Sequence, residues 1–255
     1  MSFNRLAAVR AVDPRAYWDR AGTVGYGNAM FGSSLVERHV NRRVWDGAIA
    51  IARQLGMERS ASVLDLGCGD GAFANTALAA NFAAVDGYDL SELAIRRAAA
   101  NAPGSHVRFQ ACDITSPAVA GLPRYDGAFL IGVLHHVKSS APAVIRSLRN
   151  IADRVVVLEP NGGHLLRKLL ELTPSYRAAG EDSVRRSELE RMFTAAGYRR
   201  VAWRRLNVFP NFTPQAIFRL FRGLEPFIEA TPGLRALCTA DLYGFSAEAA
   251  AVPDP

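Results

Sequence analysis

The amino-acid sequence predicts an α/β fold in which helices cover both faces of a doubly wound, mostly parallel sheet. Strand-like runs of branched and apolar residues alternate with helical patterns, as is typical of strand–helix–strand units. The run at residues 155–158 is continuously apolar, which is expected of a strand covered on both faces. A glycine-rich turn follows the first run and opens a helical pattern, so a ligand site is expected at the carboxyl edge of the sheet.

The composition predicts one large core and a reducing, cytoplasmic environment. The chain has 255 residues, of which 49% are hydrophobic. Its three cysteines, Cys68, Cys112 and Cys238, are widely separated, so we expect neither a disulfide framework nor a metal site. The first residues lack the apolar core of a signal peptide, and no uninterrupted apolar run reaches about 18 residues, so no membrane span is expected. The formal charge of +6 comes from scattered arginine pairs, which favours a solvated surface over a nucleic-acid site.

Seven strands are expected, with packing helices around them. They fall at residues 62–66, 83–89, 106–112, 125–131, 154–159, 198–206 and 240–247. Before the first strand, apolar residues recur every four positions from Val36 to Ala52, and Gly56 is placed to end that helix. Before the sixth strand, Ser187 and Glu190 predict a capping box, and Gly197 is placed to close the helix that it starts.

A segment rich in proline and phenylalanine interrupts this pattern between the last two strands. Residues 207–237 contain four prolines and five of the chain's thirteen phenylalanines. We therefore expect a single domain over 1–255, made of an N-terminal helical cap (1–60), a ligand-binding core (61–206), a helical insertion (207–237) and a last strand with a tail (238–255).

The glycine turn carries the clearest functional signal. Residues 63–74 read V-L-D-L-G-C-G-D-G-A-F-A, and Gly67 and Gly69 would let a ligand approach the main chain at a helix N-terminus. The spacing also satisfies the relaxed dinucleotide pattern, so a nicotinamide or flavin site stays open. Asp65 separates these interpretations, because a carboxylate inside a buried strand favours a ligand with a cationic group.

Four ordered motifs over residues 62–160 resemble the class I S-adenosylmethionine (SAM) dependent methyltransferases, in particular the small-molecule branch (methyltransferase type 11) that includes quinone-biosynthesis enzymes. The resemblance implies a Rossmann-like fold and SAM as cofactor, with an amino group and a sulfonium centre that Asp65 can serve. The remaining cofactor residues that it implies lie in the turn (Gly67, Cys68, Gly69), in D-G-Y-D-L-S beside the ribose (Asp89, Leu90), in A-C-D-I beside the adenine (Asp113, Ile114) and at the fourth strand beneath the methionine part (Ile131). Taken singly, Cys68 could be a small packed residue and Asp113 a helix cap.

The N-terminal segment from Tyr17 to Tyr26 resembles the part of many relatives that folds over the bound donor. On that resemblance Tyr17 and Tyr26 would cap the cofactor. An ordinary packing role is the alternative.

Candidate catalytic residues follow the fourth and fifth strands. His136 is the first candidate for a general base and His135 the second, because both lie at the carboxyl edge of the sheet. Glu159 at the end of the fifth strand is a third candidate, as a base or as a ligand for a polar substrate group, and Asn161 and His164 share its edge. The alternative is that the histidine pair structures its loop.

The insertion has three interpretations. On a helix, Phe218, Phe221 and Leu224 would share one face, with Arg219 and Arg222 turned elsewhere. That face could pack on the domain, line an apolar acceptor pocket, or make a peripheral contact with an anionic membrane.

We expect O-methylation of a small metabolite, glycan or lipid-like acceptor by in-line displacement. Methylation of nucleic-acid bases is disfavoured, because residues 126–129 read D-G-A-F and lack the N/D-P-P-Y/F pattern of enzymes that methylate exocyclic amines. RNA or protein methylation, a NAD-dependent oxidoreductase and a SAM-binding protein without activity are the alternatives.

Overall fold

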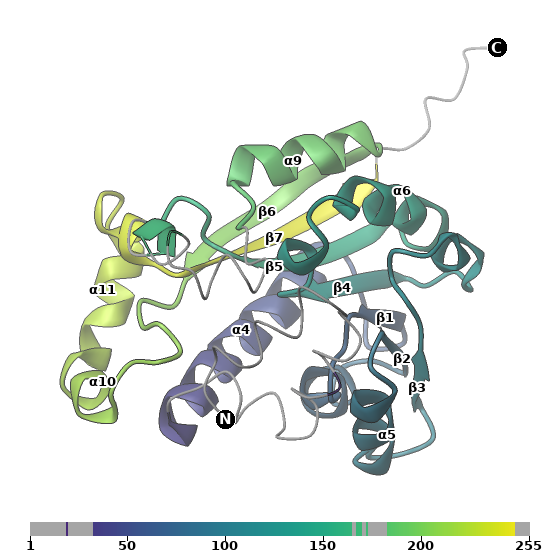
Figure 1. The fold of residues 1–255 in the computed structure, drawn as a ribbon, viewed down its shortest axis with the longest axis horizontal. Helices are drawn as coiled ribbons and strands as arrows, with labels where there is room; N and C mark the ends of the chain where they lie inside the picture. Colours follow the sequence, from purple (N-terminus) through teal and green to yellow (C-terminus); the bar gives the residue numbers. More distant parts are fainter. Residues whose placement is uncertain (1–18, 20–32, 165–166, 170–171, 173–182, 248–255) are drawn as a thin grey trace.

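All seven predicted strands form one sheet in the computed structural model, which describes residues 19, 33–164, 167–169, 172 and 183–247 (Figure 1). They are β1 (Ser62–Leu66), β2 (Ala84–Asp89), β3 (Val107–Ala111), β4 (Gly127–Ile131), β5 (Arg154–Pro160), β6 (Tyr198–Leu206) and β7 (Ala240–Ala247). Their order is β3-β2-β1-β4-β5-β7-β6, and β7 runs antiparallel to both of its neighbours. The predicted α/β fold with a Rossmann-like, mostly parallel sheet is confirmed.

The strand ends depart from the prediction mainly at β4. This strand begins at Gly127 rather than at residue 125, because Tyr125 pairs with Ala152 in an isolated bridge outside β4. The β6 strand is parallel to β5, since each pairs antiparallel with β7. The carboxyl ends of β4, β5 and β6 therefore lie at the same edge of the sheet.

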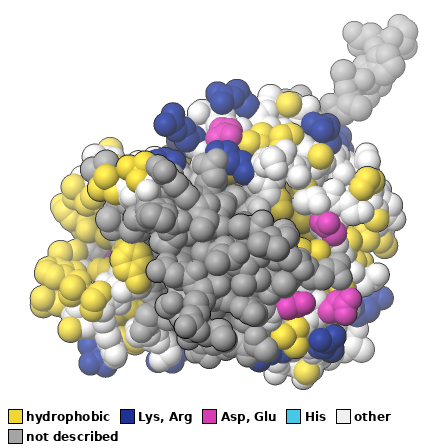
Figure 2. Space-filling view, viewed as in Figure 1, with side chains coloured by type: hydrophobic (Ala, Val, Ile, Leu, Met, Phe, Trp, Pro, Cys, Tyr) yellow, Lys and Arg dark blue, Asp and Glu magenta, His cyan; other side chains and the backbone are white. Residues whose placement is uncertain are grey.

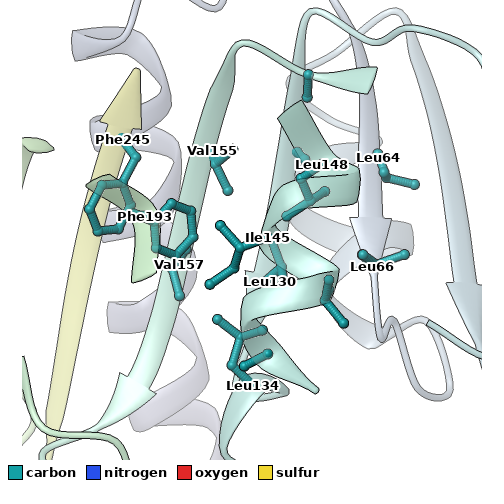
Figure 3. Close-up of a cluster of buried hydrophobic side chains, with 14 of the residues drawn as sticks. Leu64, Leu66, Leu130, Leu134, Ile145, Leu148, Val155, Val157, Phe193 and Phe245 are labelled. Atoms are coloured by element: carbon teal, nitrogen blue, oxygen red, sulfur yellow. The ribbon is translucent and has the colours of Figure 1, made fainter. Parts of the chain in front are cut away.

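Alternating side chains divide the core into two layers, one on each face of the sheet. Leu64, Leu130 and Val155 belong to the layer that contains α6 (Ala141–Ile151) and α9 (Arg186–Ala195), part of which Figure 3 shows. Their neighbours Val63, Phe129 and Val156 belong to the layer that contains α4 (Ser34–Gln54) and the short π-helix η1 (Ala74–Leu78). Burial on both faces explains the continuous apolar run that the sequence shows in β5.

The predicted N-terminal helix is α4. Ser33 caps it, since its Oγ accepts a hydrogen bond from Val36 N at 3.3 Å. Its repeating valines and alanines are buried against the sheet, and it contacts β5, β6 and β7. Gly56 follows the helix with a φ of +79°, a left-handed conformation that suits glycine.

The predicted capping box of α9 is wrong. The helix begins at Arg186, so Ser187 already lies in its first turn, and Glu190 pairs instead with Arg186 and Arg200. The capping carboxylate is that of Glu188, whose Oε2 accepts a hydrogen bond from Arg185 N at 3.4 Å. Gly197 closes the helix with a φ of +80°, as predicted.

The insertion is helical, as predicted, but its expected apolar face is divided. It contains α10 (Gln215–Phe221), α11 (Glu225–Ala230) and the 3₁₀ turns η4 (Arg222–Leu224) and η5 (Leu234–Leu237). Phe218 is fully buried, whereas Phe221 and Leu224 are 45% and 52% exposed. The α10 helix ends at Phe221, so Leu224 lies in the following 3₁₀ turn and leaves the shared face. Within the described ranges no helix has both the length and the apolar character to cross a bilayer.

Candidate cofactor-binding and active site

The glycine turn after β1 packs tightly between the end of β2 and the loop after β4. The amides of Gly67 and Cys68 both donate to Tyr88 O, at 2.7 and 3.0 Å. Gly67 has a φ of +81°, and a Cβ at this position would come within 2.5 Å of a Val133 side-chain carbon. Glycine is therefore required here both by conformation and by space.

Asp65 places a buried carboxyl group directly before this turn. Its residue is 2% exposed, and its Oδ2 has no hydrogen-bond partner among the described residues. Burial, and then the charge of Asp89, raise the pKa of Asp65 to about 8. A buried carboxylate oxygen without a partner is costly, so this position fits a ligand that brings a cationic donor. The ammonium group of SAM meets that requirement.

Asp89 connects the end of β2 to the glycine turn. Its Oδ2 accepts a hydrogen bond from Gly69 N at 2.9 Å, and its Oδ1 accepts one from Ser91 N at 2.9 Å. Burial raises the pKa of Asp89, and the two backbone bonds oppose that rise. Asp89 thus lies beside the turn, and the half-buried Leu90 follows it in the chain.

Ser91 and Asp19 are residues of this region that the sequence interpretation missed. Ser91 is fully buried and caps α5 (Glu92–Ala100), since its Oγ accepts a hydrogen bond from Ala94 N at 3.1 Å. The same hydroxyl donates to Asp19 Oδ1, so the N-terminal segment contacts the end of β2 at this residue. The serine before a helical pattern was a readable cap signal, whereas its contact with Asp19 was not. The predicted cofactor caps Tyr17 and Tyr26 lie outside the described residues.

Asp113 and Ile114 follow β3 with different exposure. Asp113 is exposed, and its Oδ1 accepts hydrogen bonds from Thr115 N at 2.8 Å and Thr115 Oγ1 at 2.7 Å. This geometry agrees with a role as a local cap. Ile114 is 6% exposed and lines an open hollow of about 270 Å³ between α6 and the 3₁₀ turn η2 (Pro117–Gly121).

Glu159 holds the loop that carries the histidine pair. It is 1% exposed, and its Oε1 accepts a hydrogen bond from Leu134 N at 2.8 Å. Its Oε2 is 3.2 Å from His135 N and 2.8 Å from His135 Nδ1. Both carboxylate oxygens of Glu159 therefore contact the 3₁₀ turn η3 (Leu134–Val137).

His136 is the more accessible member of the pair. His135 is 6% exposed and His136 is half-buried, and their ring centroids are 3.8 Å apart. The side chain of Val133 lies against Gly67, so the loop that carries the histidine pair begins beside the glycine turn. Ile131, half-buried at the end of β4, packs against the core layer of α4.

Three other candidates are used in local structure. Asn161 Nδ2 donates to Cys238 O at 2.8 Å, and Asn161 Oδ1 accepts from Gly163 N at 2.9 Å. The two ring nitrogens of His164 contact Leu237 O and Arg167 N, at 3.1 and 3.3 Å. Cys68 is buried, and burial with the charges of Asp65 and Asp89 raises the pKa of its thiol well above the usual range. A packed thiol of this kind is a poor nucleophile.

A sheet of this order, with a glycine turn after β1 and acids at the ends of β1 and β2, defines a class I SAM-dependent methyltransferase. The chain belongs to the methyltransferase domain family, whose model matches residues 37–202. Its cofactor is accordingly SAM, and the oxidoreductase alternative is set aside. A comparison with curated proteins gave no match.

Solved structures share the fold at low sequence identity. One is magnesium protoporphyrin IX methyltransferase from Synechocystis PCC 6803 with bound SAH, which is 18% identical, with 92% of this chain and 98% of that chain covered and a TM-score of 0.64. A putative methyltransferase in complex with the Haloferax volcanii Trm112 activator is 14% identical, with 91% and 98% covered and a TM-score of 0.63. A SAM-dependent methyltransferase from Mesorhizobium loti is 18% identical, with 79% and 99% covered and a TM-score of 0.56.

Proposed function

We propose that this methyltransferase transfers the methyl group of SAM to an oxygen atom of a small or lipid-like acceptor. The observation that carries the proposal is the histidine pair. Glu159 contacts His135, and the loop of the pair begins at Val133, whose side chain lies against Gly67. An imidazole at this position is needed most by a hydroxyl acceptor, because its proton must leave as the new bond forms. The similar enzyme from Synechocystis acts on magnesium protoporphyrin IX, which supports a small-molecule acceptor.

The SAM site in this proposal is built from the residues that surround the glycine turn. Asp65 faces the amino group, Gly67, Cys68 and Gly69 provide main chain, and Asp89 with Leu90 holds the ribose. Asp113 and Ile114 would hold the adenine, Ile131 would contact the methionine part, and Tyr17 and Tyr26 would cap the donor. The buried Oδ2 of Asp65 supports its assignment to the amino group, and the two backbone hydrogen bonds that Asp89 accepts at the glycine turn support its place beside that turn.

The chain's own contribution to the reaction is positioning and proton transfer. When bound, SAM supplies a methyl group that is already activated by the sulfonium centre. Bound SAM would offer this methyl carbon to the acceptor oxygen for an in-line displacement, with SAH as the leaving group. His136 receives the proton of the acceptor hydroxyl, while Glu159 holds His135 and thereby the loop of His136 in place.

The acceptor class is tested with SAM labelled in its methyl group. Phenols, catechols, hydroquinones and carboxylic acids are offered in parallel with primary amines and thiols. We expect label to enter oxygen acceptors and not amines. Transfer to amines alone would contradict the proposal while leaving the methyltransferase assignment intact.

Replacing His136 with alanine should lower kcat on an accepted hydroxyl compound by about a hundredfold or more, the usual range for a lost general base. The dissociation constant for SAM, measured by calorimetry, should stay the same, because His136 lies on the acceptor side in this proposal. His106→Ala is the matched control, since His106 is exposed directly before β3. A full rate in His136→Ala would remove His136 as the base.

The affinity for SAM should depend on pH through Asp65. The pKa of Asp65 in the free protein is about 8, so its carboxyl group is protonated at neutral pH. A cationic ligand favours the ionised form, so binding should release a proton and tighten by up to about tenfold per pH unit between about pH 6 and pH 8. Calorimetry in buffers of different ionisation enthalpy counts the released protons. Asp65→Asn should abolish both the proton release and the slope, and an unchanged slope in this variant would contradict the assignment of Asp65.

The same pKa predicts how the stability of the free protein depends on pH. The folded-state pKa of Asp65 lies above the ordinary carboxyl value of 3.8, so the folded protein holds a proton that the unfolded chain has lost. The contribution of this group to the free energy of unfolding is therefore fully present below about pH 4 and is lost as the pH rises towards about 8. Asp65→Asn should flatten this part of the profile in denaturant titrations without ligand. An identical slope in the variant would show that Asp65 does not retain that proton.

A further inference from the structure

Exposed apolar side chains gather on the insertion. Of the ten large hydrophobic residues that are exposed in the described part of the chain, seven lie between residues 212 and 237. We call these seven the insertion patch: Phe212, Ile217, Leu220, Phe221, Leu224, Phe227 and Leu237. Figure 2 shows apolar side chains gathered at the left of the view, over α10 and α11. Leu220 and Phe227 protrude most, at 74% and 64% exposure. A gathering of this kind marks an interaction surface more often than chance exposure does.

The insertion packs on α4, and this contact determines which of its side chains face away from the domain. Phe218 is fully buried, with its ring centroid 4.9 Å from that of His39 and 5.2 Å from that of Phe209. Glu225 is 1% exposed, and its carboxylate accepts a hydrogen bond from Val208 N at 2.8 Å and lies 2.5 Å from His39 Nε2. With one face of the insertion held in this way, the residues of the patch point outward.

The charged residues of the insertion are also divided between its inner and its outer side. Residues 207–237 contain only two acids, Glu225 and Glu229. Glu229 accepts a hydrogen bond from Asn207 N at 2.9 Å and pairs with Arg43 of α4, so both acids are used on the inner side. Arg219 and Arg222 are exposed. The outer surface of the insertion is therefore apolar and positively charged.

We propose that the insertion patch docks this protein onto an anionic lipid bilayer. Protruding apolar side chains flanked by arginines suit a membrane interface, where apolar burial and attraction to acidic headgroups act together. A symmetric contact between two copies fits less well, because it would bring Arg219 and Arg222 near their own equivalents without opposing acids. Docking does not depend on which acceptor is methylated.

The position of the insertion relates this surface to the candidate site. The chain leaves β6 at Leu206 and enters the insertion at the edge of the sheet where β4 and β5 also end. The segments are tied together there, since Thr239 N donates to Asn207 O at 2.6 Å and Asn161 N donates to Thr239 O at 2.8 Å. The insertion and the candidate site thus lie at the same edge of the sheet, so docking through the insertion would turn that edge towards the membrane. Access to a lipid-like acceptor, which rests on the proposed function, would follow.

Vesicle flotation tests the proposal with the full chain. The wild-type protein is mixed with vesicles of phosphatidylcholine alone or of phosphatidylcholine containing phosphatidylglycerol, at low and high salt. We expect flotation with the anionic vesicles and a decrease at high salt. Leu220→Ser with Phe227→Ser should lower the partition coefficient about tenfold or more, and Arg219→Gln with Arg222→Gln should remove the preference for phosphatidylglycerol. Val201→Ser, which changes an exposed valine of β6, is the matched control and should float as the wild type does.

The affinity for SAM is measured in parallel and should be the same in all these variants, which shows that they are folded and separates this test from that of the donor site. If the wild-type protein floats with neither kind of vesicle, the proposal is overturned. Equal flotation of the Leu220→Ser, Phe227→Ser variant would also overturn it. Sedimentation that shows a dimer which this variant dissociates, without vesicle binding, would assign the patch to a second copy of the chain instead.

Discussion

Replacing Asp89 with alanine is expected to weaken SAM binding by about a hundredfold. The carboxylate of Asp89 accepts hydrogen bonds from Gly69 N and Ser91 N at 2.9 Å, so it shapes the glycine turn as well as facing the ribose in the proposed site. Hydrogen bonds to charged groups contribute about 1.5 to 3 kcal/mol each, and about 1.4 kcal/mol corresponds to a tenfold change in a dissociation constant. Calorimetric titration with SAM gives this constant directly.

The matched control for this experiment is Glu92→Gln. Glu92 lies three residues further on, in the first turn of α5, where its side chain is 60% exposed and pairs with Arg96. This variant removes a nearby negative charge without touching the turn, so its SAM affinity should equal that of the wild type. An unchanged affinity in Asp89→Ala, with an intact fold by circular dichroism, would remove the ribose assignment.

Replacing Glu159 with alanine is expected to have the second large effect, on both stability and turnover. The substitution leaves Leu134 N, His135 N and His135 Nδ1 without their buried acceptor. Leaving a buried donor without its acceptor costs about 1 to 3 kcal/mol in the free energy of unfolding for each donor. Because the released loop carries His136, kcat should also fall, by about a hundredfold if His136 is the base.

Glu159→Gln distinguishes a positioning role from a general loss of stability. The glutamine oxygen can still accept the hydrogen bond of Leu134 N, so stability should be partly restored. The amide nitrogen cannot accept from His135, so kcat should stay low while the dissociation constant for SAM remains near the wild-type value. A glutamine variant with wild-type kcat would show that the carboxylate is not needed to position the histidine pair.

Local patterns in the sequence were sufficient to predict the fold and the glycine turn. Branched, apolar runs predicted every strand of the sheet, and the glycines with Asp65 predicted the turn, because those residue types are dictated by backbone conformation and burial at their own positions. The proximity of the loop after β4 to this turn, where Val133 lies against Gly67, followed from the rule that parallel strands end at one edge.

The sequence patterns could not predict features that depend on contacts between residues far apart in the chain. Glu159 appeared as a possible base, but its two oxygens are held by a turn that lies more than twenty residues earlier in the chain. The contact of Ser91 with Asp19 and the inward pairing of Glu225 with His39 depend on tertiary packing in the same way. At α9, the Ser187 pattern competed with Glu188, and the position of the helix start decided between them.

Calorimetric titration of the purified protein with SAM, SAH and NADH tests the central claim most directly. The buried Asp65, the glycine turn and Asp89 predict that SAM and SAH each bind one site and that NADH does not compete. Binding of NADH in that site, together with no measurable heat from SAM or SAH, would contradict the account.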